Sequence, residues 1–290
     1  MTRDDRVVVV TGATGRQGGA VARHLLAEGW RVRGVTRSPD SNAARRLAAL
    51  GVEVVRADMA DPDAMRGACA GSHGVFSVQN PMISGQEGEV AQGKKVVDAA
   101  AQAGVSHLVY GSAGPGTPGT GVAAWDAKLE VAEYARSRGL PLTVLRPMAF
   151  MELMTDKDLY PPVAAWHLMP RLVGEDKPIP WLSADDLGAI AARAFGDPAS
   201  YVGSDLALAA DHRTLLECRT IWRRVTGRSP RRFPMPVWLF ERFVGPDLTR
   251  MWRWLASHEV NVDLTETRAQ HPDAATVEEF VRRRTQPAKR

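Results

Sequence analysis

The stretch that decides the fold runs from Val7 to Leu26 and reads VVVVTGATGRQGGAVARHLL. Four consecutive valines without any polar alternation are typical of a strand that is buried on both faces in the middle of a parallel sheet. A glycine-rich turn follows directly. The apolar residues Val21, Leu25 and Leu26 then predict a helix with one face turned to the core. The stretch therefore predicts a strand, a tight turn and a helix in immediate succession.

The spacing of the glycines in this turn indicates a phosphate-binding loop. Gly12 allows the sharp turn, Gly15 allows the backbone to approach a diphosphate, and Gly18 allows the helix to lie close to the strand. The first N–H groups of the helix then face the anion. Glycine triplets also occur in ordinary turns, but here a strand precedes the triplet, a helix follows it, and a second strand ends about twenty residues later.

The spacing Gly-x-x-Gly-x-x-Gly is one residue longer than the commoner dinucleotide fingerprint. In this it resembles the short-chain dehydrogenase/reductase superfamily, and TGATGRQGGAVARHLL resembles its atypical NmrA-like branch. Further matches to that branch are VYGSAG at 109–114, LRPMAFME at 145–152, where Leu153 replaces the asparagine of the branch, and WLSADDLG at 181–188. The resemblance implies a Rossmann-type fold that binds a nicotinamide dinucleotide.

Further strands are expected at residues 31–37, 51–57, 74–78, 107–110 and 140–145, with helices between them. Such alternation predicts an α/β fold, with a doubly wound parallel sheet. We expect residues 1–150 to form this NADP-binding Rossmann core and residues 151–290 a smaller, mostly helical substrate or partner lobe. Residues 183–210 are expected to return to the core, because they contain a predicted helix and a predicted strand.

Composition limits the class of protein. The chain has 290 residues, of which 44% are hydrophobic and 24% charged, as in ordinary globular proteins. Its two cysteines, Cys69 and Cys218, are far apart, so neither a disulfide framework nor a zinc site is indicated. A soluble cytoplasmic protein without a bound metal is expected, because no apolar run has the length of a membrane span. The segment between Thr214 and Ala256 contains nine arginines and three acidic residues. This excess of positive charge is more typical of solvated helix faces than of nucleic-acid binding.

The end of the second strand indicates which dinucleotide is bound. An acid at this position bonds the adenosine ribose of NAD, whereas a basic residue suits the additional phosphate of NADP. Here Thr36 and Arg37 occupy the position, and Arg16 of the glycine loop can reach the same side. Two guanidinium groups that can grip one phosphate favour NADP(H). The alternative is that both arginines are solvated surface residues.

Other cofactor contacts follow from topology or from the resemblance. Ligands lie beyond the carboxyl ends of parallel strands, which places Gln79 and Asn80 near the central part of the cofactor. The resemblance implies that Asp58 and Met59 lie at the adenine, although Asp58 is equally suited to cap the next helix. It also implies that the segment after the sixth strand lies beside the nicotinamide. The full set of expected cofactor-binding residues is Gly12, Thr14, Gly15, Arg16, Gln17, Gly18, Arg37, Asp58, Met59, Gln79, Asn80, Ser112, Lys128, Pro147 and Met148.

The usual proton donor of the superfamily is missing. Its reductases use Tyr-x-x-x-Lys, in which the tyrosine exchanges a proton with the substrate and the lysine holds the ribose. The residue four positions before Lys128 is Ala124, and none of the six lysines has a tyrosine at that offset. Lys128 remains suited to donate to the ribose hydroxyls of the nicotinamide, with a solvated helix lysine as the alternative.

Four residues are candidates for a substitute acid: Tyr110, Ser112, Tyr160 and His167. Tyr110 ends a predicted strand and is expected to be half-buried. His167 lies in an apolar run, where a single histidine is more often structural than catalytic. Water is the remaining source of the proton, which suffices for easily reduced electrophiles such as quinones.

The predicted lobe is irregular and rich in aromatic residues. Such aromatics pack a core more often than they bind substrate, but a flat apolar substrate would also suit them. They are Trp222, Trp238, Phe240, Phe243, Trp252 and Trp254. The basic end of the chain, Arg282 to Arg290, is expected to be a frayed tail.

Two functions are consistent with these features. One is an NADPH-dependent reductase of a small, flat, electron-poor substrate such as a quinone or a conjugated carbonyl. The other is a non-catalytic NADP(H)-sensing regulator that acts through a protein partner. The aromatic lobe and Lys128 favour the first function, whereas the missing tyrosine favours the second.

Overall fold

The computed structural model describes residues 6–156, 164–231 and 234–285. The chain divides into two compact units. The first comprises Met1–Pro118, Ala124–Arg146 and Ala184–Leu206, and the second comprises Gly119–Ala123, Pro147–Ser183 and Ala207–Arg290. By this division the segment 184–206 belongs to the first unit, and the second unit resumes at Pro147.

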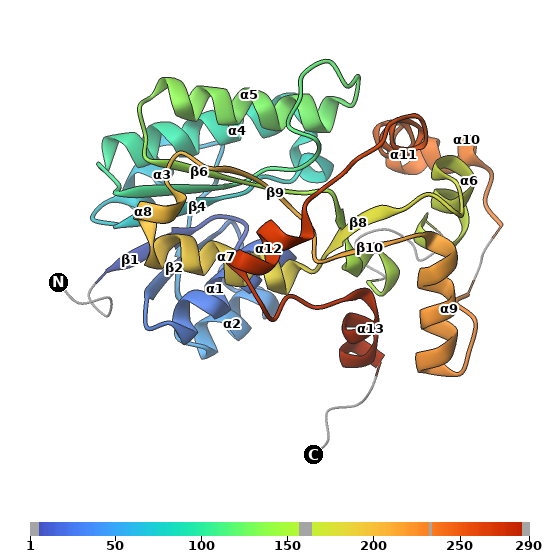
Figure 1. Ribbon diagram of the computed structural model, residues 1–290. Helices are drawn as coiled ribbons and strands as arrows, with labels where there is room; N and C mark the ends of the chain where they lie inside the picture. The colour runs from blue at the N-terminus through green and yellow to red at the C-terminus, as the bar shows by residue number, and fades with distance from the viewer. Residues whose placement is uncertain (1–5, 157–163, 232–233, 286–290) are drawn as a thin grey trace. The chain divides into compact units, whose positions relative to one another are not determined.

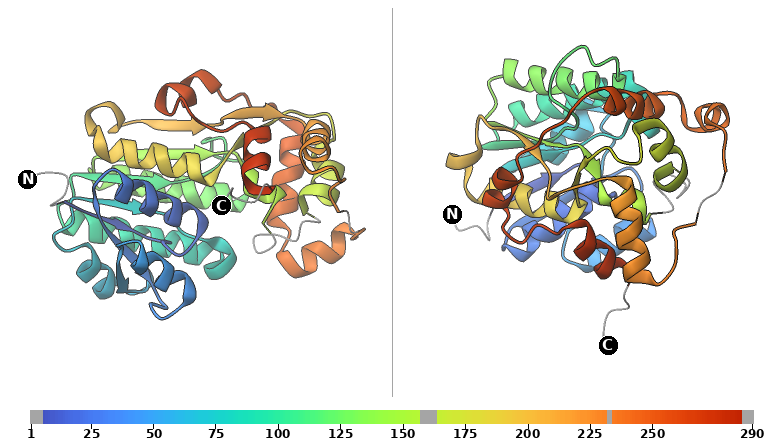
Figure 2. Two further views of the ribbon diagram at one scale, coloured as in Figure 1. Left: turned by 90° about the horizontal axis from the view of Figure 1, so that it is seen from below. Right: turned by 45° about the vertical axis from the view of Figure 1, so that its right-hand side comes forward.

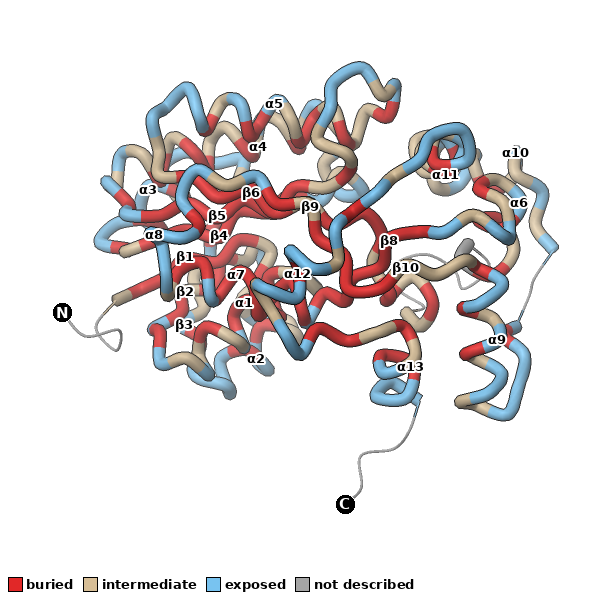
Figure 3. The backbone as a smooth tube through the Cα atoms, in the orientation of Figure 1, coloured by how far each residue is buried: buried red, intermediate tan, exposed pale blue. Residues whose placement is uncertain are grey.

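A seven-stranded sheet in the order β3-β2-β1-β4-β5-β6-β9 organises the first unit (Figure 1). Its strands are β1 (Val7–Val10), β2 (Arg31–Thr36), β3 (Glu53–Arg56), β4 (Gly74–Ser77), β5 (His107–Gly111), β6 (Leu142–Pro147) and β9 (Asp205–Leu208). Neighbours from β3 to β6 pair in parallel. The four valines of β1 are buried, because strands and helices cover them on every side (Figure 3). The predicted Rossmann-type fold is confirmed.

Helices cover both faces of this sheet (Figures 1 and 2). One face carries α1 (Arg16–Ala27), α2 (Asn42–Ala49) and α7 (Ala184–Gly196). The other face carries α3 (Pro62–Cys69), α4 (Pro81–Gln102) and α5 (Ala123–Ser137). A short helix, α8 (Pro198–Tyr201), follows α7. α1 and α7 approach so closely that a Cβ at Gly188 would lie 2.7 Å from the backbone of Ala20. The Asp185 carboxylate, in the first turn of α7, contacts His24 and Arg23 of α1. The His24 hydrogen bond is the main reason why the pKa of Asp185 lies well below its usual range.

Two helices begin at capping residues that lie close to other possible caps. Asp61 caps α3, since its carboxylate accepts hydrogen bonds from the amides of Asp63 and Ala64. The alternative role of Asp58 as this cap is therefore wrong, and Asp58 accepts a hydrogen bond from the Ala60 amide. α4 begins at Pro81, and Gly85 interrupts it with φ 69°.

The second unit is built from shorter elements. A three-stranded sheet in the order β10-β8-β7 contains β7 (Ala149–Phe150), β8 (Ile179–Leu182) and β10 (Asp211–Arg213). The helical elements are η2 (Met151–Met154), η3 (Ala164–Leu168), α6 (Met169–Val173), α9 (Leu215–Thr226), α10 (Val237–Val244), α11 (Asp247–Ser257), α12 (Leu264–Gln270) and α13 (Val277–Thr285). The expected frayed tail is wrong as far as residue 285, because α13 buries Val277, Phe280 and Val281.

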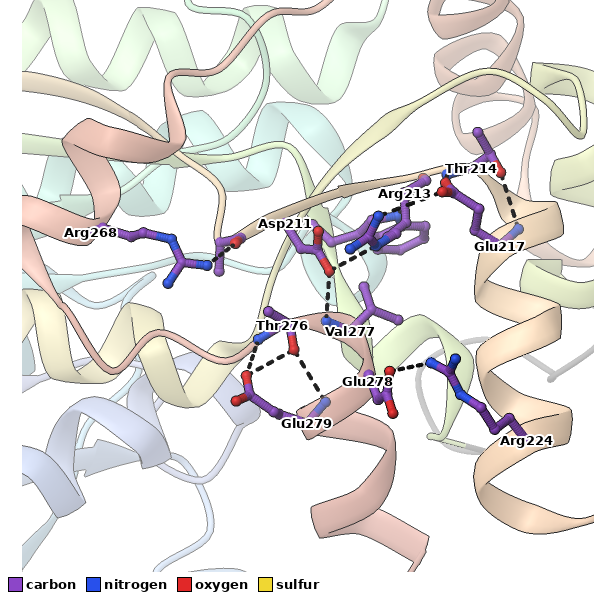
Figure 4. Close-up of polar contacts among 12 residues, drawn as sticks. Asp211, Arg213, Thr214, Glu217, Arg224, Arg268, Thr276, Val277, Glu278 and Glu279 are labelled. Carbon is purple, nitrogen blue, oxygen red and sulfur yellow. Dashed lines mark hydrogen bonds and ion pairs between the residues drawn. The ribbon is translucent and has the colours of Figure 1, made fainter.

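Hydrogen bonds join β10 to α13 in this unit (Figure 4). The Asp211 carboxylate accepts from the Val277 amide at 3.1 Å and from Arg213 Nε at 3.2 Å. Glu278 of α13 pairs with Arg224 of α9. These contacts tie the chain's last described helix to the small sheet.

The aromatic residues of the second unit divide into two groups. Phe240 and Trp252 are buried and stack with ring centroids 5.8 Å apart, and Trp166 meets Trp222 edge to face. Trp238 and Phe243 of α10, in contrast, are 66% and 76% exposed. Core packing thus accounts for only part of the aromatic set.

Cys69 and Cys218 are free and buried, as expected. Within the described ranges no helix is long and apolar enough to cross a membrane. The same residues contain no group of three His, Cys, Asp or Glu side chains arranged to hold a metal ion.

Candidate functional site

The loop between β1 and α1 has the geometry that its glycine spacing predicts. Gly12 adopts φ 59°, a conformation that favours glycine, and its carbonyl accepts from the Gly15 amide at 2.8 Å. A Cβ at Gly18 would lie 2.4 Å from that carbonyl oxygen. The first turn of α1 contains no acidic residue. The N–H groups at the start of this helix therefore form a site suited to a phosphate anion.

This loop lies at the topological switch point of the sheet, between β1 and β4. The buried Thr11 hydroxyl donates to the Val78 carbonyl at 3.0 Å and accepts from the Val78 amide at 2.8 Å. Thr11 thus fixes the carboxyl ends of the two strands at the place where ligands bind in such folds. This role could not be predicted from the sequence, because nothing in a single threonine after a strand indicates its partner 67 residues away.

Three side chains at this edge carry buried polar atoms that have no hydrogen-bond partner among the described residues. They are the Oε1 atoms of Gln17 and Gln79 and the Oγ atom of Ser112. Gln79 and Ser112 are 4% and 1% exposed. The Gln17 amide lies beside Gly111, where an added Cβ would be 3.2 Å from its oxygen. Since buried polar atoms are rarely left unpaired, these three indicate the place of a polar ligand.

A second part of the edge lies at the ends of β2 and β3. Arg37 is exposed, and its guanidinium has no partner within the described chain. The guanidinium of Arg56 donates to the Arg37 carbonyl at 3.1 Å and pairs with Asp40 at 3.3 Å. Arg56 thus adds a third arginine to the two expected from the sequence. Its position as the last residue of β3 is the signal that could have identified it.

Asp58 and Met59, the residues expected at the adenine, follow Arg56 closely in the sequence. The Met59 sulfur accepts a hydrogen bond from Gln79 Nε2 at 3.8 Å, which links the ends of β3 and β4. Asn80 is exposed and caps α4 by accepting from the Met82 amide at 3.0 Å. A structural role therefore accounts for the Asn80 side chain.

Lys128 is buried, although the alternative sequence interpretation made it a solvated helix residue. Its Nζ donates to Glu89 Oε1 of α4 at 2.6 Å, and the two side chains are 10% and 0% exposed. No pattern in the sequence singled out Glu89. Only the packing of α4 on α5 brings together two residues 39 positions apart.

Tyr110 is 1% exposed, so the expectation of a half-buried tyrosine is wrong. Its ring belongs to the core between the sheet, α4 and α5. Burial, followed by the negative charge of Glu89, raises the pKa of Tyr110 well above its usual value. The phenol therefore stays protonated and enclosed, a poor position for donating a proton to a bound substrate.

Arg146 holds the loop that follows β5. Its Nη1 donates to the Gly114 carbonyl at 3.1 Å, and Nε pairs with Asp205. A Cβ at Gly116 would lie 2.5 Å from the guanidinium carbon, so the loop closely contacts this side chain. The rigid β6 thereby positions the glycine-rich segment after Ser112.

The remaining expected residues lie elsewhere. Pro147 and Met148 are buried at the start of the second unit. His167 belongs to the same unit, with Nε2 3.3 Å from Arg171 Nη1. Tyr160 lies outside the described residues. The first unit thus brings together Gly12, Gln17, Gln79 and Ser112 at one edge of its sheet.

Comparison with known proteins identifies the family. The model of the NmrA-like family matches residues 4–281. The chain belongs to the NmrA-like family. An NmrA-like family domain-containing oxidoreductase from Aspergillus flavus, lnaB, is 34% identical over 262 residues, which cover 82% of this chain and 78% of that protein. FrzB of Cladobotryum sp., another such oxidoreductase, is 34% identical over 259 residues, with 80% and 77% covered.

Solved structures of relatives share the fold. NmrA, a negative transcriptional regulator, has been solved in complex with NADP; it has a TM-score of 0.77 and 24% identity, with 97% of this chain and 96% of that chain covered. Citrobacter sp. triphenylmethane reductase complexed with NADP(H) has a TM-score of 0.77 and 19% identity, with 96% and 99% covered. These two structures show the shared fold, and their proteins are described as a negative transcriptional regulator and as a reductase.

Proposed function

We propose that this protein is an NADPH-dependent reductase of a small, flat, electron-poor substrate such as a quinone or a conjugated carbonyl. The observation that carries the proposal is the set of partnerless buried polar atoms on Gln17, Gln79 and Ser112, gathered at the switch point beside a glycine loop. These groups fit a dinucleotide, which offers donors and acceptors along its length. Relatives described as oxidoreductases support the same reading.

The preference for NADPH rests on the end of β2. No acid stands there to bond a ribose hydroxyl, and the exposed Arg37 lies beside Arg56. Planar guanidinium groups match the oxygens of a 2′-phosphate. Arg16, half-buried in the glycine loop, is the second expected contact.

Bound NADPH would supply the hydride. The chain's own groups hold it: the first turn of α1 binds the diphosphate, Arg37 the 2′-phosphate, and Lys128 the ribose of the nicotinamide. Because Ala124 replaces the usual tyrosine and Tyr110 is enclosed, we propose that water protonates the reduced product. Substituting Tyr110→Phe, Tyr160→Phe or His167→Ala should then reduce turnover by far less than the roughly 10²–10⁴-fold expected for a lost general acid.

Titration calorimetry with NADPH and NADH tests the cofactor. Wild type should bind NADPH more tightly, and Arg37→Asp should reduce or reverse the preference, since one charge-assisted contact is worth about 1.5–3 kcal/mol, or roughly ten-fold or more in affinity. Arg31→Asp is the control, because Arg31 is an exposed residue at the opposite end of the same strand. Equal affinity of wild type for both dinucleotides would contradict the proposal.

A non-catalytic NADP(H)-sensing regulator is the second candidate, favoured by the absent tyrosine. Consumption of NADPH with a panel of quinones and enones separates the two. Tight binding of NADPH without turnover of any acceptor would establish the regulator instead.

A further inference from the structure

Glu89 and Lys128 form a buried ion pair between α4 and α5. Their side chains are 0% and 10% exposed, and Nζ lies 2.6 Å from Oε1. Both helices cover the same face of the sheet (Figure 1). A carboxylate and an ammonium that leave water together lose much hydration, so such a pair persists only where its geometry is good.

The backbone of the two helices fixes this geometry. A Cβ at Gly93 would lie 2.6 Å from a Val131 methyl group, so α4 and α5 approach closely one turn beyond the pair. Lys94 and Glu130 form a second ion pair across the same helices, also at 2.6 Å. Gly85 interrupts α4, so the regular helix starts just before Glu89.

The charged and titratable groups around Lys128 come from three elements. Glu89 faces it from α4, and Tyr110 lies close to Glu89 from β5, as the effect of Glu89 on the Tyr110 hydroxyl shows. On α5 itself, Glu130 points to Lys94 in the exposed pair, with 55% and 36% of the two side chains accessible. Glu89 is therefore the carboxylate that compensates the charge of Lys128.

We propose that Glu89 is a positioning residue, which holds the Lys128 ammonium charged and in place to bind the ribose of the nicotinamide. This inference rests on the proposed binding of NADPH. Glu89 lies in the interior and acts through Lys128, whereas the lysine touches the cofactor. An unpaired ammonium in the same place would give up its proton or turn toward solvent, because burial disfavours the isolated charge.

The first experiment measures the dissociation constants of NADPH and of 2′,5′-ADP for Glu89→Gln. NADPH binding should weaken about ten-fold, the effect of losing one charge-assisted hydrogen bond. The fragment 2′,5′-ADP stops short of the nicotinamide ribose, so its affinity should not change. Glu130→Gln removes the exposed pair between the same helices and should leave both constants at their wild-type values. Unchanged NADPH binding in Glu89→Gln would overturn the inference.

Two further readouts separate positioning from a merely structural role. Lys128→Ala should weaken NADPH binding, and adding Glu89→Gln to it should produce no further loss. Glu89→Asp should restore part of the affinity for NADPH. The same variant can replace Glu89→Gln in the binding measurements if Glu89→Gln fails to fold. Additive losses, or weaker binding of 2′,5′-ADP, would show that Glu89 only supports the fold.

A measurement without cofactor distinguishes this inference from the proposed function. In protein labelled with ¹⁵N-lysine, the Lys128 ammonium should give a slowly exchanging signal that Glu89→Gln abolishes and Glu130→Gln preserves. If wild type fails to bind NADPH, the proposed function fails, and with it the ribose contact. If wild type binds NADPH and the signal survives in Glu89→Gln, only the role of Glu89 is overturned.

Discussion

The buried polar side chains at the two ends of β5 differ in their hydrogen bonding. At the amino end, His107 Nε2 is 2.8 Å from the Thr143 hydroxyl, which donates to the Tyr201 carbonyl at 2.7 Å. At the carboxyl end, the Ser112 hydroxyl has no partner among the residues that the structure describes. At the amino end the Thr143 hydroxyl joins two neighbouring elements, although His107 Nδ1 has no hydrogen-bond partner among the described residues, whereas at the carboxyl end the Ser112 hydroxyl joins none. The difference teaches that two equally buried hydroxyls next to one strand can have different tasks, one within the fold and one available to a ligand.

Thr143→Val should have the largest effect on stability. Valine has the shape of threonine but cannot bond His107 or the Tyr201 carbonyl, so two buried groups lose their partner. We expect a loss of about 3 kcal/mol in the free energy of unfolding, since each unsatisfied buried group costs roughly 1–3 kcal/mol. Urea denaturation measures the loss, and calorimetry should show unchanged NADPH affinity. A near-neutral change would mean that the two ends of β5 do not differ as described.

The second largest expected effect is the change in the free energy of unfolding with pH. Burial and the neighbouring His73 lower the pKa of His107 to about 4. In the unfolded chain His107 binds a proton below about pH 6.5, and in the folded chain only below about pH 4. The contribution of neutral His107 to the free energy of unfolding is therefore complete above pH 6.5 and is lost as the pH falls toward 4. Between pH 7 and 5 the loss should be about 2 kcal/mol.

Urea denaturation at a series of pH values tests this expectation. His107→Gln should flatten the profile over that interval, because glutamine does not titrate. His73, whose pKa is lowered mainly by burial, adds to the loss in the same direction. A profile equally steep in His107→Gln would assign the titration to other groups.

Ser112→Ala should have the smallest effect on stability. Removing a hydroxyl that has no protein partner should change the free energy of unfolding by less than about 1 kcal/mol, or even raise it. NADPH affinity or turnover should fall instead. Loss of stability like that of Thr143→Val, with ligand binding intact, would erase the contrast between the two ends.

Much of the first unit could be predicted, because its signals are local. The run Val7–Val10, the glycines at 12, 15 and 18, and the alternation of strands and helices each depend on near neighbours. The sequence left Asp58 as one possible cap of α3, and the structure has Asp61 in that role, since either acid suits a helix start. The end of the chain was misjudged for a different reason: α13 is held by Asp211 and Arg224, which are distant in sequence.

The sequence by itself determined the parallel sheet, the phosphate-binding loop, the absence of a Tyr-x-x-x-Lys motif and the basic residue at the end of β2. These are properties of composition and short-range spacing. Only the tertiary structure decided that Thr11 fixes Val78, that Tyr110 is enclosed, and that Glu89 holds Lys128. The physical reason is that burial and charge pairing depend on which distant segments pack together, and no local pattern of residues encodes those partners.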